Sequence, residues 1–267
     1  MNPVKEKLRS GQVVLGQIVL ELFTPGVAPM LAASGMEFVL YDMEHGRCDI
    51  GLLETMVISC RGTGIVPFCR VPDVNFVPMS RVLDLGVRGV MVPRMETREQ
   101  MIETVSVLKY APQGRRGVAL GVAHDLYRSG GAAFLPQAND DTMVIAIIET
   151  VRGIENIDSI LSVPGLDIAW MGHYDLTVSM GIAAQFDHPR FLAAMDLIVA
   201  TSRKYGVAAG FMASSAEDAL HWIEKGYRAL SVGSDVITYM TACRSNIQTV
   251  MSSLTKRASR SANEVSE

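Results

Sequence analysis

Hydrophobic residues along this chain gather in short runs rich in β-branched and aliphatic side chains. Eight runs have the length and composition of buried strands, at residues 13–19, 37–42, 65–70, 88–93, 143–149, 166–172, 206–211 and 228–233. The segments between them show helical spacing or begin with helix-capping residues, as at Asp49, Thr97 and Ser214–Ser215. The pattern therefore predicts strands that alternate with helices from one end of the chain to the other.

Alternation of near-continuous apolar strands with helices predicts a parallel sheet covered by helices. Eight repeats in 267 residues favour a single (β/α)₈ TIM barrel, an α/β fold, with a doubly wound sheet as the alternative. No Ser/Pro/Gly-rich linker divides the chain, so we expect one domain over residues 1–254. The polar residues 255–267 are predicted to form a disordered tail.

Composition narrows the classes of partner. Hydrophobic residues make up 49% and charged residues 19%, and the net charge of −4 comes without any basic stripe, which argues against nucleic acid. No apolar run is long enough to span a membrane or act as a secretory signal. The four cysteines form no CxxC pair, so we expect reduced thiols and a cytoplasmic protein. The small net charge and the lack of a basic stripe favour small molecules as partners.

Two further segments stand out. Residues 111–142 form a long connection, of a length that is usually functional or mobile. The last predicted helix, residues 234–254, carries an apolar seam at alternating steps of four and three. That seam favours packing along another helix, and packing on its own barrel and contact with another subunit both stay open.

Candidate chemistry follows from where the strands end, because catalytic groups of barrel enzymes come from the C-terminal ends of strands. The polar residues at these ends are Asp42, Glu44, His45, Arg70, Glu149, His173 and Asp175. We therefore expect them to converge on one rim of the barrel.

Glu149 carries the strongest single signal, because it ends an otherwise apolar strand and a carboxylate there needs a cation or an Arg to offset its desolvation. Glu149 and Asp175 on adjacent strands suit a hard divalent ion such as Mg²⁺ or Mn²⁺. The absence of HExxH and of Cys/His clusters argues against a closed zinc site. No lysine lies on a predicted strand facing the interior, which argues against a Schiff-base mechanism.

With these residues placed, the chain resembles the HpcH/HpaI family of metal-dependent pyruvate aldolases. The resemblance covers residues 12 to 250, nearly the whole chain. It rests on the order and spacing of the stretches "FVLYDMEHG", "PFCRVP", "VLDLGVRGVMVPRMETREQ", "RRGV", "IIETVRGIENIDSILSVPGLD", "MGHYDLTVSMGI" and "LSVGSD".

The resemblance implies a (β/α)₈ barrel that assembles as a homo-oligomer, a hexamer or trimer of dimers, with the last helix exchanged between subunits. It implies that Glu149 and Asp175 bind a divalent metal (Mg²⁺, Mn²⁺ or Co²⁺) and that Arg70 binds the carboxylate or oxo group of pyruvate. His45 with Asp42 would be an acid/base pair. No nucleotide cofactor is implied.

The implied reaction is cleavage or formation of a 4-hydroxy-2-oxo acid, giving pyruvate and an aldehyde through a metal-stabilised enolate. Gly172, His173 and Tyr174 would line the pyruvate pocket. Arg116, with His124, would bind the acid group on the aldehyde side, with loop stabilisation as the alternative role. Glu44 would orient other groups or balance the charge of Arg47.

Two positions depart from the family pattern. Ile147 stands where many members have Gln, which removes a polar contact, and His173 replaces the usual Pro of a "GPxDL" motif. Both departures bear on the substrate. Two other functions stay open. One is an acyl-CoA lyase of the citramalyl or malyl type, which has a related architecture, and the other is a catalytically altered barrel that only binds a ligand, which Ile147 and His173 alone support.

Overall fold

A computed structural model of the chain describes residues 1–74, 76–128 and 130–264. Eight parallel strands pair in sequence order and close on themselves, because the first strand also pairs with the last. They are β1 (Val14–Val19), β2 (Phe38–Asp42), β3 (Val66–Arg70), β4 (Gly89–Val92), β5 (Met143–Ile148), β6 (Ile168–Met171), β7 (Ala208–Ala213) and β8 (Ala229–Ser234). The predicted (β/α)₈ barrel is confirmed, and each strand lies within two residues of its predicted place.

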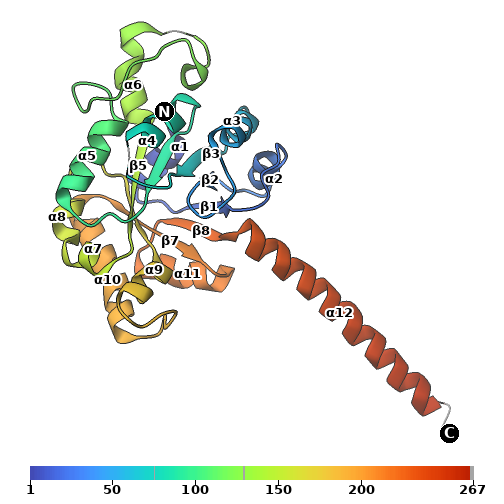
Figure 1. The fold of residues 1–267 in the computed structure, drawn as a ribbon. Helices are drawn as coiled ribbons and strands as arrows, with labels where there is room; N and C mark the ends of the chain where they lie inside the picture. Colours follow the sequence, from blue (N-terminus) through green and yellow to red (C-terminus); the bar gives the residue numbers. More distant parts are fainter. Residues whose placement is uncertain (75, 129, 265–267) are drawn as a thin grey trace.

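Helices surround the barrel (Figure 1). They are α1 (Pro3–Arg9), α2 (Val27–Ala33), α3 (Ile50–Ser59), α4 (Phe76–Asp84), α5 (Arg98–Leu108), α6 (Phe134–Asp141), α7 (Val151–Glu155), α8 (Ile157–Leu161), α9 (His173–Ser179), α10 (Pro189–Tyr205), α11 (Ala216–Lys225) and α12 (Asp235–Glu264). Short 3₁₀ turns occupy Ala123–Asp125 and Gly131–Ala133. The predicted caps are present: Asp49 accepts the Leu52 N–H, Thr97 forms a capping box with Gln100, and Ser215 accepts the Asp218 N–H.

Each strand contributes to two apolar layers, because successive side chains of a strand point to opposite faces. Phe38, Phe68, Ile145 and Trp170 belong to the cluster inside the barrel. Their neighbours along the strands, such as Val39 and Cys69, pack in the larger cluster beneath the helices. The buried interior forms the floor on which residues at the C-terminal ends of the strands lie.

The last helix, α12, projects away from the barrel as a single long rod (Figure 1). It contacts β1 and β8 at its start, and beyond that Met240, Ile247, Val250 and Leu254 expose between 43% and 64% of their surface. The seam does not pack on its own barrel. The helix also continues to Glu264, where the composition predicted a disordered tail from residue 255; residues 265–267 lie outside the described part of the chain.

The connection over residues 111–142 lies at the N-terminal ends of the strands. It follows α5 and leads into β5. Its residues, Thr142 just before β5 among them, line one cavity together with Ile65 and Pro67 at the start of β3. No helix in the described part of the chain is long and apolar enough to cross a membrane.

Candidate active site

Strand alternation brings four residues of the predicted rim to the inner side of the barrel. Asp42 follows Phe38 and Leu40 in the inward series of β2, and Arg70 follows Val66 and Phe68 in that of β3. In the same way Glu149 continues the inward series of β5, and Gly172 that of β6. These four residues therefore lie at the C-terminal end of the barrel, over its apolar interior.

Asp42 and Arg70 form a two-point ion pair. They are register partners on β2 and β3, Arg70 Nε donates to Asp42 Oδ1 over 2.7 Å, and Arg70 Nη2 donates to Asp42 Oδ2. Asp42 is fully buried and also accepts the Glu44 N–H. Burial disfavours the charge of Arg70, but the carboxylates of Asp42, Glu44 and Glu149 hold its pKa above the ordinary value. The guanidinium is thus a fixed positive charge at the rim.

Glu44 and His45 occupy the loop after β2. Glu44 Oε2 lies 3.2 Å from Arg70 Nη1 and 3.8 Å from His45 Nε2, while the His45 side chain is 59% exposed. Arg70 bonds to both carboxylate oxygens of Asp42, and the ion-pair partner of His45 is Glu44; the acid/base pairing of His45 with Asp42 stays a prediction. Glu44 also pairs with Arg70, and no ion pair of Glu44 with Arg47 is found among the described residues.

Glu149 is a buried carboxyl group held by the backbone. Only 4% of the residue is exposed, and its Oε1 accepts the Arg94 N–H over 2.6 Å. Burial raises its pKa to about 7, and the negative charges of Asp175 and Glu44 act in the same direction. Sequence reasoning did not identify Arg94, because a backbone donor in the left-handed region, here at φ 52°, is not tied to a residue type.

Gly172 leaves space for the Glu149 carboxylate. A Cβ at Gly172 would lie 2.5 Å from both Cβ and Oε2 of Glu149 and 2.9 Å from Cγ2 of Ile147. Ile147 is buried in the barrel interior, so the side chain below this carboxylate is apolar where many family members were expected to place an amide. The glycine is needed for close approach and the isoleucine contributes to the desolvation of the site.

The first turn of α9 carries His173, Tyr174 and Asp175. The His173 ring packs 4.7 Å from the ring of Tyr174, 5.3 Å from Phe186 and 5.1 Å from Phe211, measured between centroids. Burial lowers the pKa of His173 to about 4, so the imidazole is neutral near pH 7. Asp175 is exposed, and its charge raises the pKa of both Glu149 and Glu44. His173 is therefore part of an aromatic cluster beside this rim.

Arg116 does not join this group within one chain. It is buried, its Nη2 donates to Asp84 Oδ1 over 2.6 Å, and its guanidinium stacks 4.5 Å from the centroid of Tyr110. His124 lies 4.0 Å from the same aspartate. Both belong to the connection at the N-terminal ends of the strands. A segment between a helix and the following strand lies at the end opposite the rim, so these two residues lie away from the rim of their own chain, and their contact with the substrate stays a prediction.

Two lysines are buried: Lys5 in α1 and Lys109 at the C-terminal end of α5. Their ammonium groups bond to Thr142 O, and that of Lys109 also bonds to Asn139 O. These contacts lie at the N-terminal end of the barrel, far from the rim that holds Glu149.

The rim has the composition of a cation site. Asp42, Glu44 and Glu149 act on the Arg70 guanidinium, and Asp175 acts on Glu44 and Glu149. Glu44 Oε2 is buried and has Arg70 Nη1 as its ion-pair partner. Three or more His, Cys, Asp or Glu side chains do not converge as a metal cage anywhere in the described part of the chain. Excess negative charge with oxygen donors and few fixed ligands fits Mg²⁺-type coordination, in which waters and substrate complete the shell.

Comparison with known proteins agrees with this geometry. The model of the HpcH/HpaI aldolase/citrate lyase family matches residues 18–242. The chain belongs to this family. Its rim residues Asp42, Arg70, Glu149 and Asp175 all fall within the matched range.

Several relatives in the family are similar over most of their length. A hydroxypyruvate/pyruvate aldolase from Cupriavidus necator is 31% identical over 243 residues, which is 91% of this chain and 90% of that protein. A 2-keto-3-deoxy-L-rhamnonate aldolase from Escherichia coli is 30% identical over 241 residues, 90% of each chain. The family is thus one of carbon–carbon lyases.

Solved structures give the same picture. An HpcH/HpaI aldolase from Desulfitobacterium hafniense superposes with a TM-score of 0.87 at 30% identity, covering 92% of this chain and 95% of that one. A citrate synthase superposes with a TM-score of 0.83 at 28% identity, covering 93% and 97%.

Proposed function

We propose that this protein is a divalent-metal-dependent class II aldolase that cleaves or forms a 4-hydroxy-2-oxo acid, with pyruvate and an aldehyde as the two fragments. The observation that carries the proposal is the cluster of Arg70 with the carboxylates of Asp42, Glu44 and Glu149, extended by Asp175 and placed over an apolar barrel floor. Support comes from the relatives, which are named as aldolases of 2-oxo acids.

Glu149 and Asp175 would hold the metal, with Mg²⁺, Mn²⁺ and Co²⁺ as candidates. When bound, a divalent cation supplies a Lewis acid that stabilises negative charge on the oxygens of a 2-oxo acid. The raised pKa of Glu149 supports this assignment, because a buried carboxyl group next to Asp175 and Glu44 is relieved by a nearby positive charge.

Arg70 would bind the carboxylate or oxo group of pyruvate. Two of its five N–H donors bond to Asp42, which fixes the plane of the guanidinium, and the others are left for Glu44 and the substrate. The ion pair holds the group in place before substrate arrives, so little reorganisation accompanies the appearance of charge in the transition state.

His45 would exchange the proton of the 4-hydroxyl group. In cleavage the base takes that proton, the C3–C4 bond breaks, an aldehyde leaves, and the electron pair stays on the pyruvate fragment as an enolate. The His45 side chain is exposed at the mouth and its Nε2 faces Glu44, so a substrate hydroxyl at this rim can reach the imidazole.

A second copy of this chain would cover the exposed apolar seam of α12. A projecting helix that leaves Met240, Ile247, Val250 and Leu254 in solvent favours exchange of this helix between subunits of a homo-oligomer. A hexamer built as a trimer of dimers agrees with the resemblance described above.

Proton exchange at pyruvate tests the aldolase without knowledge of the aldehyde. The methyl signal of pyruvate is followed by NMR in D₂O with metal-stripped protein, and again after addition of Mg²⁺ or Mn²⁺, Mg²⁺ giving the sharper spectra. We expect metal-dependent loss of the signal, abolished by Glu149→Gln and by Arg70→Ala. The control Glu155→Gln changes an exposed glutamate of α7 and should leave the rate unchanged. Exchange at the background rate with every metal, for both pyruvate and hydroxypyruvate, would overturn the proposal.

A further inference from the structure

A second cavity lies at the end of the barrel opposite the rim. It has a volume of about 810 Å³ and is bordered by α1, by the segments that lead into β5, β6 and β7, and by the C-terminal ends of α10 and α11. This volume is within the range of small-molecule sites in proteins, roughly 300–1,000 Å³. The aldolase chemistry proposed above uses none of the residues that line it.

The charges around this cavity are predominantly positive. Five cationic side chains line it and two anionic ones, in a chain whose net charge is −4. The cations are Lys5, Arg9, Lys109, Arg203 and Arg228, and the anions are Asp140 and Asp167. A concave surface with charges of one sign focuses the electrostatic potential and attracts ligands of the other sign.

Two of these cations are buried lysines, which are rare in folded proteins. Lys5 is 5% exposed and pairs with Asp167 over 3.0 Å, while Lys109 is 3% exposed and bonds to two carbonyl oxygens over 2.6 Å each. Burial lowers the pKa of Lys109 to about 7, the charges of Lys5 and Arg9 lower it further, and Asp167 and Asp140 offset part of that effect. Lys109 thus has two other cations near it, Lys5 and Arg9, and two carboxylates.

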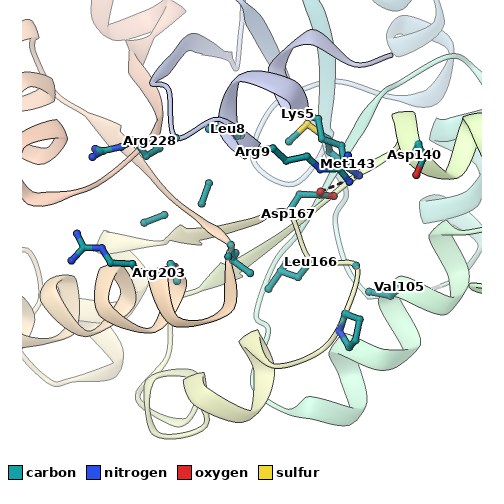
Figure 2. A pocket seen from close by; sticks show the side chains of 18 of the residues that line it. Lys5, Leu8, Arg9, Val105, Asp140, Met143, Leu166, Asp167, Arg203 and Arg228 are labelled. Carbon is teal, nitrogen blue, oxygen red and sulfur yellow. Dashed lines mark ion pairs between the residues drawn. The ribbon is translucent and has the colours of Figure 1, made fainter.

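The arginines that line the cavity have N–H donors that form no bond within the described part of the protein and could bind a ligand. Arg228 uses one nitrogen, Nη1, to bond to the carbonyl oxygens of Ile223 and Tyr227 at the C-terminal end of α11. Arg9 and Arg203 are exposed and form no ion pair with any described residue. Figure 2 shows Lys5 and Arg9 beside Asp167 on one side of the cavity, and Arg203 and Arg228 on the other, with apolar side chains such as Leu8 and Leu166 between them.

We infer that this cavity binds a small polyanion, a metabolite that carries two or more phosphate or carboxylate groups. Positive charge on both sides of an apolar middle suits a ligand with anionic groups at both of its ends. Helix-end capping accounts for part of the role of Arg228, as cations are favourable near helix C-termini. The buried lysines have partners in Asp167 and in the carbonyl oxygens of Thr142 and Asn139, so the donors left for a ligand are those of the arginines.

Isothermal titration of the full chain with inorganic pyrophosphate and with citrate, without added divalent metal, tests the site. The proposal expects saturable binding of at least one probe, and the arm that binds tells phosphate from carboxylate ligands. The double variant Arg9→Ala/Arg203→Ala should weaken binding at least about tenfold, since each arginine would supply charge-assisted hydrogen bonds to the anion. Both arginines are exposed, so the variant is expected to fold.

Two controls locate the binding. Lys204→Ala removes one positive charge from α10, the helix that carries Arg203. Lys204 pairs with Asp158 and does not line the cavity, so binding should be retained. The double variant Asp42→Asn/Arg70→Met removes the cation of the opposite rim together with its buried partner and should also leave binding intact. Absence of binding for both probes, or binding insensitive to Arg9→Ala/Arg203→Ala, or binding lost in Asp42→Asn/Arg70→Met, would overturn the inference. None of these outcomes bears on pyruvate exchange, so the two proposals fail independently.

Discussion

Asp42 and Arg70 are register partners on neighbouring strands, and their side chains form a two-point ion pair at the C-terminal end of the barrel. The backbone pairing of β2 and β3 fixes the two Cα atoms side by side, and strand alternation points both side chains inward. Asp42 is fully buried, so without Arg70 its carboxylate would lose the partner that offsets its desolvation.

Removing one partner of this pair should cost more than removing both charges. Arg70→Met leaves a buried, uncompensated carboxylate and should lower the free energy of unfolding by about 3–5 kcal/mol. Adding Asp42→Asn should restore a large part of that loss, because the amide oxygen still accepts the Glu44 N–H. Urea denaturation of the two single variants and the double variant measures this coupling. Additive losses in the double variant would contradict it.

Gly172→Ala should displace the Glu149 carboxylate. The added Cβ would lie 2.5 Å from Glu149 Oε2, a distance that requires a shift. A misplacement of catalytic groups by about 1 Å can cost roughly 100-fold in rate, so we expect a loss of that order in metal-dependent pyruvate exchange. Gly117→Ala is the matched control, since nothing lies within 4 Å of its added Cβ. An exchange rate in Gly172→Ala equal to that of Gly117→Ala would show that Glu149 tolerates the methyl group.

Much of this site follows from sequence periodicity, and part of it does not. The eight apolar runs placed Asp42, Arg70, Glu149 and Gly172 at strand ends, which is enough to bring them to one rim. The partner of Asp42 did not follow from the apolar runs, because its pairing with Arg70 depends on the register between β2 and β3, which the runs do not fix. Chain connectivity alone already locates Arg116, since any segment that runs from a helix to the next strand lies at the opposite end of the barrel.

The continuation of α12 beyond residue 254 lacked a sequence signal as well. Its polar residues match the composition of a disordered tail, but composition alone does not distinguish a disordered tail from a solvent-exposed helix. The seam over residues 234–254 indicated a helix–helix contact, and only the structure showed that the helix leaves its own barrel.

Glu149 should make stability depend on pH. Its pKa rises from 4.5 in the unfolded chain to about 7 in the fold, so between these values the folded state holds a proton that the unfolded state has lost. Stability contributed by this group is complete below pH 4.5 and is lost as the pH rises through 7. At pH 8 the carboxylate then costs about 3 kcal/mol as an upper bound.

Glu149→Gln tests that assignment in the metal-free protein. The variant keeps an acceptor for the Arg94 N–H, and it should be more stable than the wild type at pH 8 and lose this advantage towards pH 4.5. Thermal denaturation across this range gives the comparison. A variant that is equally destabilised at both pH values would indicate a packing defect in place of a desolvated charge. Divalent metal should raise the melting temperature of the wild type at pH 8 and leave that of Glu149→Gln nearly unchanged.

Asp235 should position the loop that follows β1. This buried carboxylate, at the start of α12, accepts the N–H groups of Leu20, Glu21 and Leu22 over 2.9, 2.9 and 2.6 Å. The carbonyl oxygen of Leu20 in turn lies 3.0 Å from the position of a Cβ on Gly46, the residue after His45. The base of α12 is therefore connected through one loop to the loop of the proposed acid/base.

Asp235→Ala should release this connection. Leaving three backbone donors without their acceptor should cost about 1–3 kcal/mol or more of stability. Hydrogen exchange should show loss of protection at Glu21 and Leu22, and the kcat of the aldol reaction should fall more than KM rises, because His45 moves while Arg70 stays in place. Asp187→Asn, at an exposed aspartate, serves as the control. Unchanged amide protection in Asp235→Ala would mean that the loop is held by its other contacts, and a fall in kcat would then need a different cause.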